Sequence, residues 1–123
     1  MHIIKATLEH FDDLVPLFDA YRVFYKCDSD PEGARKYLRP LMEQKWSVVF
    51  LAYEGNDAAG FAQLYPFRSS VGMCDYWVLN DLYVSNDFRR HGVGRILLEQ
   101  CIEFAKEDGA AKLVLETGHD NYP

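Results

Sequence analysis

The sequence predicts an α/β (α+β) fold in which helices flank a mixed, mostly antiparallel central sheet. Three observations lead to this expectation. Apolar residues recur at helical spacing in two stretches of the N-terminal third, strand-like runs joined by a tight turn follow, and a last helix and strand come after a glycine-containing loop. The expected element order is β-α-α-β-β-β-α-β, an order that forms a sheet covered by helices.

The N-terminal third is expected to form a strand and two helices. Residues 1–6 alternate enough for a strand, and apolar residues then follow helical spacing from 8 to 25. Thr7 is a suitable N-cap for that helix, with His10 at the position where a capping box usually has glutamate. An Asp-Pro pair predicts the start of a second helix, over residues 31–45.

The middle of the chain is strand-like, and the C-terminal part returns to a helix and a strand. Residues 47–53 and 59–67 are predicted to form a hairpin. Residues 73–84 are long for one strand, which indicates a bulge or a kink. A third helix is expected from Gly92 or Val93 to a glycine cap at 109, followed by a short buried strand at 112–117.

A glycine- and arginine-containing loop precedes the third helix and has the properties of an anion site. The first turn of a helix carries unpaired N–H groups and partial positive charge. Gly92 and Gly94 lack Cβ atoms, so a phosphate can approach the backbone, and Arg89, Arg90 and Arg95 add positive charge. The Gly-Lys-Ser/Thr of a nucleotide P-loop and the third glycine of a dinucleotide-binding turn are both missing.

The pattern Arg-x-x-Gly-x-Gly at 89–94 follows a strand that ends in Leu82-Tyr83-Val84 and precedes Leu97-Leu98, and Asp120-Asn121 follows the next strand. Taken together, these features resemble the pyrophosphate loop of the GNAT superfamily of acetyl-CoA-dependent N-acetyltransferases, particularly its amine and histone acetyltransferases. The resemblance implies a single GNAT domain over 1–123. The chain stops where the family continues with a helix and two strands, so we expect a domain that is truncated at its C-terminus.

The resemblance also implies how acetyl-CoA is bound. Loop N–H groups would hold the pyrophosphate, and the strand end would pair with the pantetheine arm as an added strand does, where two strands splay apart. The N–H near Val84 would polarise the thioester carbonyl. The expected cofactor-binding residues are Leu82, Tyr83, Val84, Arg89, Arg90, His91, Gly92, Val93, Gly94, Arg95 and Asn121.

Three residues are candidates for activating the amine, whose ammonium form has a pKa of about 10.4 and must lose a proton before attack. Asp81 is the best candidate carboxylate, although it can equally be a structural group that orders the loop. Asn80 stands where polyamine-type relatives often have glutamate; it cannot act as a base but can orient a water. Neighbours on a strand face opposite ways, so both serve the site only if the strand bulges. Glu116 is the reserve.

Acidic and aromatic residues gather in sequence around the link between the first two helices, which borders the acceptor site in the family. Such groups suit a cation, although the tyrosines are also suited to the core and Asp30 to a helix cap. The residues are Tyr21, Tyr25, Asp28, Asp30 and Glu32, and the central strands add Tyr65, Phe67 and Trp77, which can line the cleft or belong to the core.

Composition limits the partners. The net charge of −6 argues against a nucleic-acid binder and is compatible with a cationic substrate. No apolar run approaches the roughly 20 residues of a membrane span, and no histidines have metal-ligand spacing. Three cysteines without paired spacing, and no signal-peptide pattern, predict a cytoplasmic protein. The last strand would have an exposed edge, so we expect the isolated chain to be marginally stable or to form a homodimer.

The expected function is transfer of an acetyl group from acetyl-CoA to a primary amine: a polyamine, a small amine or a lysine side chain. Two alternatives remain open. The chain can be a non-catalytic acyl-CoA-binding relative, which the asparagine at position 80 favours, together with the absence of the tyrosine that protonates the leaving thiolate in the family. It can also be a fragment that is completed by association with another chain.

Overall fold

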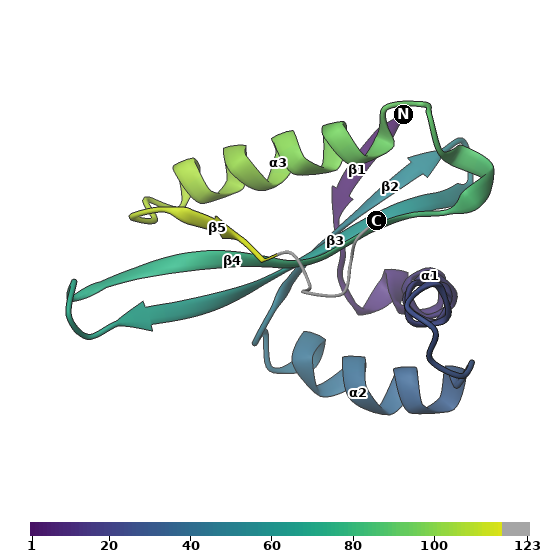
Figure 1. The fold of residues 1–123 in the computed structure, drawn as a ribbon, viewed down its shortest axis with the longest axis horizontal. Helices are drawn as coiled ribbons and strands as arrows, with labels where there is room; N and C mark the ends of the chain where they lie inside the picture. Colours follow the sequence, from purple (N-terminus) through teal and green to yellow (C-terminus); the bar gives the residue numbers. More distant parts are fainter. Residues whose placement is uncertain (117–123) are drawn as a thin grey trace.

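One five-stranded sheet forms the centre of the molecule, with the strand order β1-β2-β3-β4-β5 (Figure 1). The computed structural model describes residues 1–116. Pairing is antiparallel from β1 to β4 and parallel between β4 and β5, so the predicted fold class and element order are confirmed. The strands are β1 (His2–Lys5), β2 (Val48–Glu54), β3 (Asp57–Ser69), β4 (Cys74–Val84) and β5 (Leu113–Leu115).

Helices cover both faces of this sheet. The helices are α1 (Phe11–Phe24), α2 (Pro31–Glu43) and α3 (Val93–Glu107). Helices α1 and α2 lie on one face and α3 on the other, as Figure 1 shows, while the long β3–β4 hairpin extends beyond the helices. The alternation of side chains along β2 makes this three-layer arrangement possible. Val49 and Leu51 are buried against α1 and α2, and Phe50 and Ala52 are buried against α3.

The N-terminal caps agree with the sequence, but the first helix begins later than expected. The Thr7 hydroxyl accepts from the Glu9 N–H at 3.2 Å, and His10 Nδ1 accepts from the Thr7 N–H at 3.0 Å, so histidine completes the capping box. This box caps a 3₁₀ turn, η1 (Leu8–His10), and the α-helix starts only afterwards. At the second helix, the carboxylate of Asp30 accepts from the N–H of residue 33 at 3.0 Å, as the cap prediction requires.

The bulge expected in the long strand is present at Asn80. Gln63 of β3 pairs with Asp81, and the next residue, Leu64, pairs with Leu79, so Asn80 is an extra residue in β4. An extra residue in one strand bends that strand and increases its twist. It also places Leu79 and Asp81 on opposite faces of the sheet, because Leu79 packs in the α3 core while Asp81 hydrogen-bonds to Tyr21 of α1.

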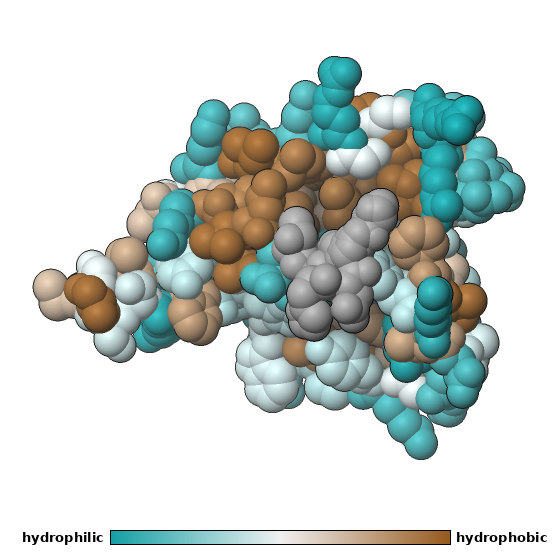
Figure 2. Space-filling model, in the orientation of Figure 1, coloured by the Kyte–Doolittle hydropathy of each residue, from teal (hydrophilic) through white to brown (hydrophobic). Residues whose placement is uncertain are grey.

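The last strand is less buried than predicted. β5 has three residues, of which Leu113 and Val114 are half-buried and Leu115 is 54% exposed, so the expectation of a buried strand at 112–117 was wrong. Among the described residues, β5 is the edge of the sheet, and an edge strand is covered on one side only. Figure 2 shows apolar side chains gathered over α3 and β5 on this side of the molecule. Within residues 1–116, no helix combines the length and the apolar character needed to cross a bilayer.

Candidate functional site

Strands β4 and β5 separate at Asn80. Their pairing runs from Trp77 to Leu79, and the last backbone hydrogen bond joins the Glu116 N–H to the Leu79 carbonyl at 3.0 Å. Beyond that bond, no strand among the described residues pairs with the outer edge of β4. Within residues 1–116, the sheet therefore has a strand edge without a partner strand from Asn80 to Val84, bordered by the end of β5.

The backbone groups on that edge follow from the pairing with β3. The N–H of Ser85 donates to the carbonyl of Ala59 at 2.8 Å, so Ser85 faces β3. Because backbone groups in an antiparallel strand alternate between the two sides, the N–H and C=O groups of Leu82 and Val84 point outward. Apart from the Val84 carbonyl, which accepts from Arg89 Nε, these are the groups that an extended ligand or an added strand can bind.

Asp81 lies just inside this edge, at the centre of a buried hydrogen-bond network. Its Oδ1 accepts from the Tyr21 hydroxyl at 2.8 Å and from Asn80 Nδ2 at 3.1 Å, and its Oδ2 accepts from Gln63 Nε2 at 3.0 Å. Gln63 Oε1 in turn accepts from the Ser47 hydroxyl at 2.8 Å. Burial, and secondarily the Asp81 carboxylate, raises the pKa of Tyr21, so its hydroxyl stays a donor.

Hydrogen bonds from neighbouring side chains hold the Asp81 carboxylate in place. Both of its oxygens already accept hydrogen bonds, and its side chain is only 7% exposed. A carboxylate can only accept, so the amide of Asn80 is oriented with its nitrogen toward Asp81 and its oxygen Oδ1 available to a ligand. Asn80 is itself exposed, at the point where β4 and β5 separate.

Sequence reasoning missed Gln63 and Ser47, which hold Asp81 in place. Gln63 is fully buried and lies directly opposite Asp81 in the β3–β4 register. The one signal in the sequence is a glutamine inside an otherwise apolar strand. A buried amide there needs partners on both of its ends, and a carboxylate on the neighbouring strand is a natural one.

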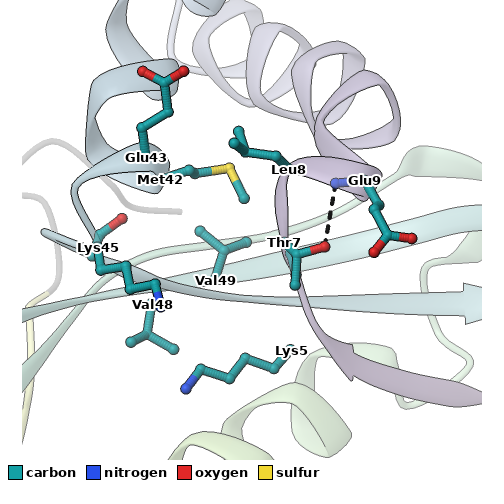
Figure 3. A pocket seen from close by; sticks show the side chains of 11 residues that line it. Lys5, Thr7, Leu8, Glu9, Met42, Glu43, Lys45, Val48 and Val49 are labelled. Carbon is teal, nitrogen blue, oxygen red and sulfur yellow. Dashed lines mark hydrogen bonds between the residues drawn. The ribbon is translucent and has the colours of Figure 1, made fainter.

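Ser47 also lines a cavity of about 600 Å³ between the end of α2 and the turn at Thr7–Glu9 (Figure 3). Its walls come from β1, β2, η1 and α2, on the far side of β3 from the open edge of β4. This cavity therefore does not belong to the strand edge described above.

Aromatic side chains surround Asp81 on the α1–α2 face. The Tyr21 ring lies 5.3 Å from that of Tyr25 and 5.9 Å from that of Tyr83, between ring centroids. The hydroxyls of Tyr37 and Tyr65 are 3.3 Å apart, and burial, with that hydrogen bond and the Asp81 charge, raises the pKa of Tyr65. Rings and a carboxylate in this arrangement suit a cationic ligand.

The other predicted acceptor-side residues are placed differently. The Asp28 carbonyl accepts from Arg22 at 3.1 Å, Asp30 caps α2, and Glu32 is exposed. Trp77 is partly buried and packs against the α3 core, and its indole N–H donates to an aspartate at the end of α3. Phe67 is 54% exposed on the projecting hairpin.

The loop that contains Gly92 connects β4 to α3, and α3 begins without a side-chain cap among the described residues. Gly92 is the N-cap of α3 with a φ of 78°, and no side chain among the described residues caps this terminus. The first helical hydrogen bond runs from the Ile96 N–H to the Gly92 carbonyl at 3.1 Å, so the N–H groups of Val93, Gly94 and Arg95 precede it. A Cβ on Gly92 would have nothing within 4 Å, which leaves open space beside these donors.

The remaining loop residues divide into two groups. Arg90, with a φ of 70°, and Arg95 are exposed, and no hydrogen bond or ion pair joins their side chains to the rest of residues 1–116. His91 is exposed and packs edge-on against Phe88, with ring centroids 6.4 Å apart. The Arg89 side chain instead binds another part of the protein, because its Nε donates to the Val84 carbonyl at 3.0 Å.

Comparison with known proteins identifies the arrangement. The sequence profile of the Acetyltransferase (GNAT) family matches residues 14–123. The chain belongs to the GNAT family of acetyltransferases. It is 40% identical over 121 residues to YhfO, an uncharacterised N-acetyltransferase of Bacillus subtilis, covering 98% of this chain and 81% of that protein.

Two further relatives extend the comparison. The crystal structure of a probable acetyltransferase superimposes with a TM-score of 0.90 at 42% identity, covering 98% of this chain and 82% of that one. A thialysine N-epsilon-acetyltransferase of Caenorhabditis elegans is 29% identical over 111 residues, covering 90% of this chain and 69% of that protein. This GNAT chain is therefore an acetyltransferase by family, and members of the family generally use acetyl-CoA.

The described residues of this GNAT domain fit that co-substrate. A pyrophosphate needs backbone N–H donors that no Cβ obstructs. The start of α3 has such donors. There is open space beside Gly94, because a Cβ on this residue would meet nothing closer than Val84 Cγ2 at 3.7 Å. The predicted ligand Asn121 lies outside the described residues. Glu116 is exposed at the end of β5. Within 1–116, no cluster of three or more His, Cys, Asp or Glu side chains is placed to hold a metal.

Proposed function

We propose that this GNAT domain transfers the acetyl group of acetyl-CoA to a primary amine by direct attack within a ternary complex. The observation that carries the proposal is a coincidence of three features at one edge of the sheet. An uncapped helix terminus, an unpaired stretch of β4 and the Asn80–Asp81 bulge lie in succession along the chain. Together they offer an anion cradle, a strand edge and polar groups beside the point where the strands part.

Acetyl-CoA supplies the acetyl group as a thioester, and the protein's part is to hold it. The N–H groups from residues 90 to 95 would bind the pyrophosphate, with Arg90, His91 and Arg95 adding charge around it. The outward N–H and C=O groups of Leu82 and the outward N–H of Val84 would pair with the pantetheine arm, since the Val84 carbonyl already accepts from Arg89. The Val84 N–H then lies where it can donate to the thioester carbonyl as negative charge develops there.

The proton of the acceptor amine is handled at the bulge. Asp81 already accepts three hydrogen bonds, so we assign it the role of orienting Asn80. Asn80 Oδ1 would accept from the ammonium or from a water that carries its proton to solvent. A C–N bond then forms, the C–S bond breaks, and the thiolate of coenzyme A leaves. Glu116, at the end of β5, is the second candidate for receiving the proton.

The acceptor is proposed to be a small cationic amine. Tyr21, Tyr25, Tyr37 and Tyr65 lie on the α1–α2 face around Asp81, and the chain has a net charge of −6. Aromatic faces and nearby carboxylates attract ammonium groups. The name of the nematode relative indicates an amine similar to the lysine side chain, which agrees with this class of substrate.

A coupled assay of thiol release tests the proposal. Acetyl-CoA is supplied with a panel of polyamines, thialysine, free lysine and lysine-containing peptides, and we expect release of coenzyme A with at least one small diamine. Asn80→Ala should lower kcat, and Asp81→Asn should lower it by a similar factor, because both disturb the same oriented amide. The proposal is rejected if no amine in the panel releases thiol.

A second candidate function is acyl-CoA binding without turnover. It is favoured by one observation: the buried Asp81 carboxylate already accepts three hydrogen bonds, and its neighbour is an amide that cannot act as a base. In that case acetyl-CoA would raise the melting temperature, but no amine would release thiol. The absence of any thermal shift would instead argue against the anion cradle itself.

The proposed oligomer is a homodimer. Its support is the position of β5 at the edge of the described sheet, with Leu115 54% exposed. Light scattering coupled to size-exclusion chromatography measures the mass directly. A single species with the mass of one chain across the micromolar range would refute the dimer.

A further inference from the structure

The peptide unit that ends β4 is held from both sides. On the inner side, the Ser85 N–H donates to the carbonyl of Ala59 in the turn-proximal part of β3 at 2.8 Å. On the outer side, Arg89 Nε donates to the Val84 carbonyl at 3.0 Å. The guanidinium thus takes the place that the next strand's N–H would have in a continuous sheet. Two opposed hydrogen bonds fix the plane of one peptide and with it the end of the strand.

Arg89 is also anchored by two aromatic rings and by a second donor nitrogen. The centre of its guanidinium lies 5.0 Å from the ring centroid of Phe24, at the end of α1, and 5.5 Å from that of Tyr83 in β4. Its Nη1 is 3.4 Å from the side-chain oxygen of Asn86, in the turn that follows β4. One side chain therefore joins the end of α1, the end of β4 and the loop.

Arg89 limits the register in which a ligand can pair with the open edge of β4. Leu82 and Val84 together present four outward backbone groups, two donors and two acceptors. Arg89 occupies the last acceptor, the Val84 carbonyl. A ligand that pairs along the edge therefore meets its final protein partner at the Val84 N–H and can slide no further along the strand. The side chain that limits the register is the same one that fixes the neighbouring peptide plane.

We propose that Arg89 is a positioning residue for acetyl transfer: it closes the open edge of β4 at the Val84 carbonyl, so that the Val84 N–H stands opposite the thioester carbonyl. This rests on the proposed function. It differs from the expectation that the motif arginine serves as charge beside the phosphate, which needs a guanidinium directed at the ligand. In the structure two of its nitrogen atoms donate to protein oxygens, and its guanidinium lies over the rings of Phe24 and Tyr83.

Two thioesters separate the two roles. Acetyl-CoA carries the phosphates, whereas acetyl-pantetheine has the same arm and thioester without the nucleotide. If Arg89 positions the strand end, Arg89→Gln lowers kcat for both thioesters by the same factor, roughly 10- to 100-fold, as expected for a misplaced catalytic donor. Arg89→Lys, which keeps the charge but loses the planar fork, fails to restore kcat. A loss confined to acetyl-CoA, or full rescue by lysine, overturns the proposal.

Arg95→Gln is the matched control, since it removes one exposed positive charge from the first turn of α3. It should raise KM for acetyl-CoA and leave KM for acetyl-pantetheine unchanged. If Arg95→Gln changes KM for neither thioester, the proposed phosphate site at the start of α3 is refuted. The kcat of Arg89→Gln with acetyl-pantetheine, which has no phosphate of the nucleotide, then decides the positioning role by itself. Melting temperatures of all variants show whether any loss comes from unfolding.

A measurement without turnover completes the test. In ¹H–¹⁵N spectra of the free protein, Arg89→Lys should shift the backbone amides of Val84 and Ser85, because the peptide plane between them loses its outer hydrogen bond. Phe24→Leu removes one face of the guanidinium contact and should shift the same amides by less. Unchanged amides in both variants refute the positioning role, whatever the enzyme assays give.

Discussion

Replacing Gln63 with leucine should remove more stability than its conservative size suggests. Gln63 is fully buried and makes two hydrogen bonds, to Asp81 and to Ser47, at 3.0 and 2.8 Å. Leucine fills similar space but leaves a carboxylate oxygen and a hydroxyl without a partner, in side chains that are 7% and 8% exposed. A hydrogen bond to a charged group contributes about 1.5–3 kcal/mol and a neutral one about 1 kcal/mol. The expected loss is therefore about 2–4 kcal/mol.

Urea unfolding measures this loss, and a double-mutant cycle locates it. Against a total stability of about 5–15 kcal/mol, the shift in midpoint should be large, with an unchanged slope. Ser47→Ala should cost about 1 kcal/mol in the wild-type background and almost nothing beside Gln63→Leu, because the serine has then already lost its acceptor. Additive costs, or a loss below about 1 kcal/mol for Gln63→Leu, would refute the network.

Gln63→Glu gives the same network a pH signature. The new carboxyl at position 63 would lie beside the Asp81 carboxylate in a buried place, and burial and like charge both raise its pKa above the unfolded value of about 4.3. A group with a raised pKa in the folded state favours folding below the unfolded pKa and opposes it as the pH rises. The stability deficit of this variant should therefore be largest near pH 7 and shrink toward pH 4. A deficit independent of pH would contradict the placement.

Three further predictions follow from the geometry. Gly92→Val should weaken acetyl-CoA binding at least tenfold by calorimetry, and it should also cost about 1–2 kcal/mol of stability, because Gly92 has a φ of 78°; an unchanged Kd would count against the cradle. Gly60→Ala should cost about 1–3 kcal/mol in urea, since its Cβ would lie 2.7 Å from a carbonyl oxygen of β4; a neutral result would refute that close approach. Burial raises the pKa of Tyr21, Tyr53 and Tyr65, so their contribution to stability is complete below pH about 10 and lost above it; a urea midpoint that stays constant to pH 11 would disagree.

Much of the fold could be predicted because local signals agreed with the final packing. The Asp-Pro pair begins α2, the tight turn joins β2 to β3, and the glycine loop leads into α3. The bulge at Asn80 was also indicated by the sequence. Residues 73–84 are long for one regular strand, and Asn80 and Asp81 can serve one site only if the strand bulges there. Caps, turns and bulges depend on a few neighbouring residues, which is why they are visible in one sequence.

The site was only partly predictable, because its key contacts join residues far apart in the chain. Nothing local shows that Gln63 and Tyr21 would converge on Asp81 and donate hydrogen bonds to both of its oxygens. Arg89 matched a loop motif, but its partners lie in α1 and β4, which a motif does not describe. The burial of the last strand was overestimated because an apolar run of three residues does not reveal whether anything covers it.

The bulge at Asn80 has an evolutionary consequence. Leu79 and Asp81 already face opposite sides of the sheet, as immediate neighbours in an ordinary strand do. Loss of the single codon for Asn80 would therefore leave every remaining side chain of β4 on the layer it now occupies, and the scaffold could persist while its reactive edge straightened. A single deletion could therefore abolish acetyl transfer and still leave a folded protein that binds the ligand.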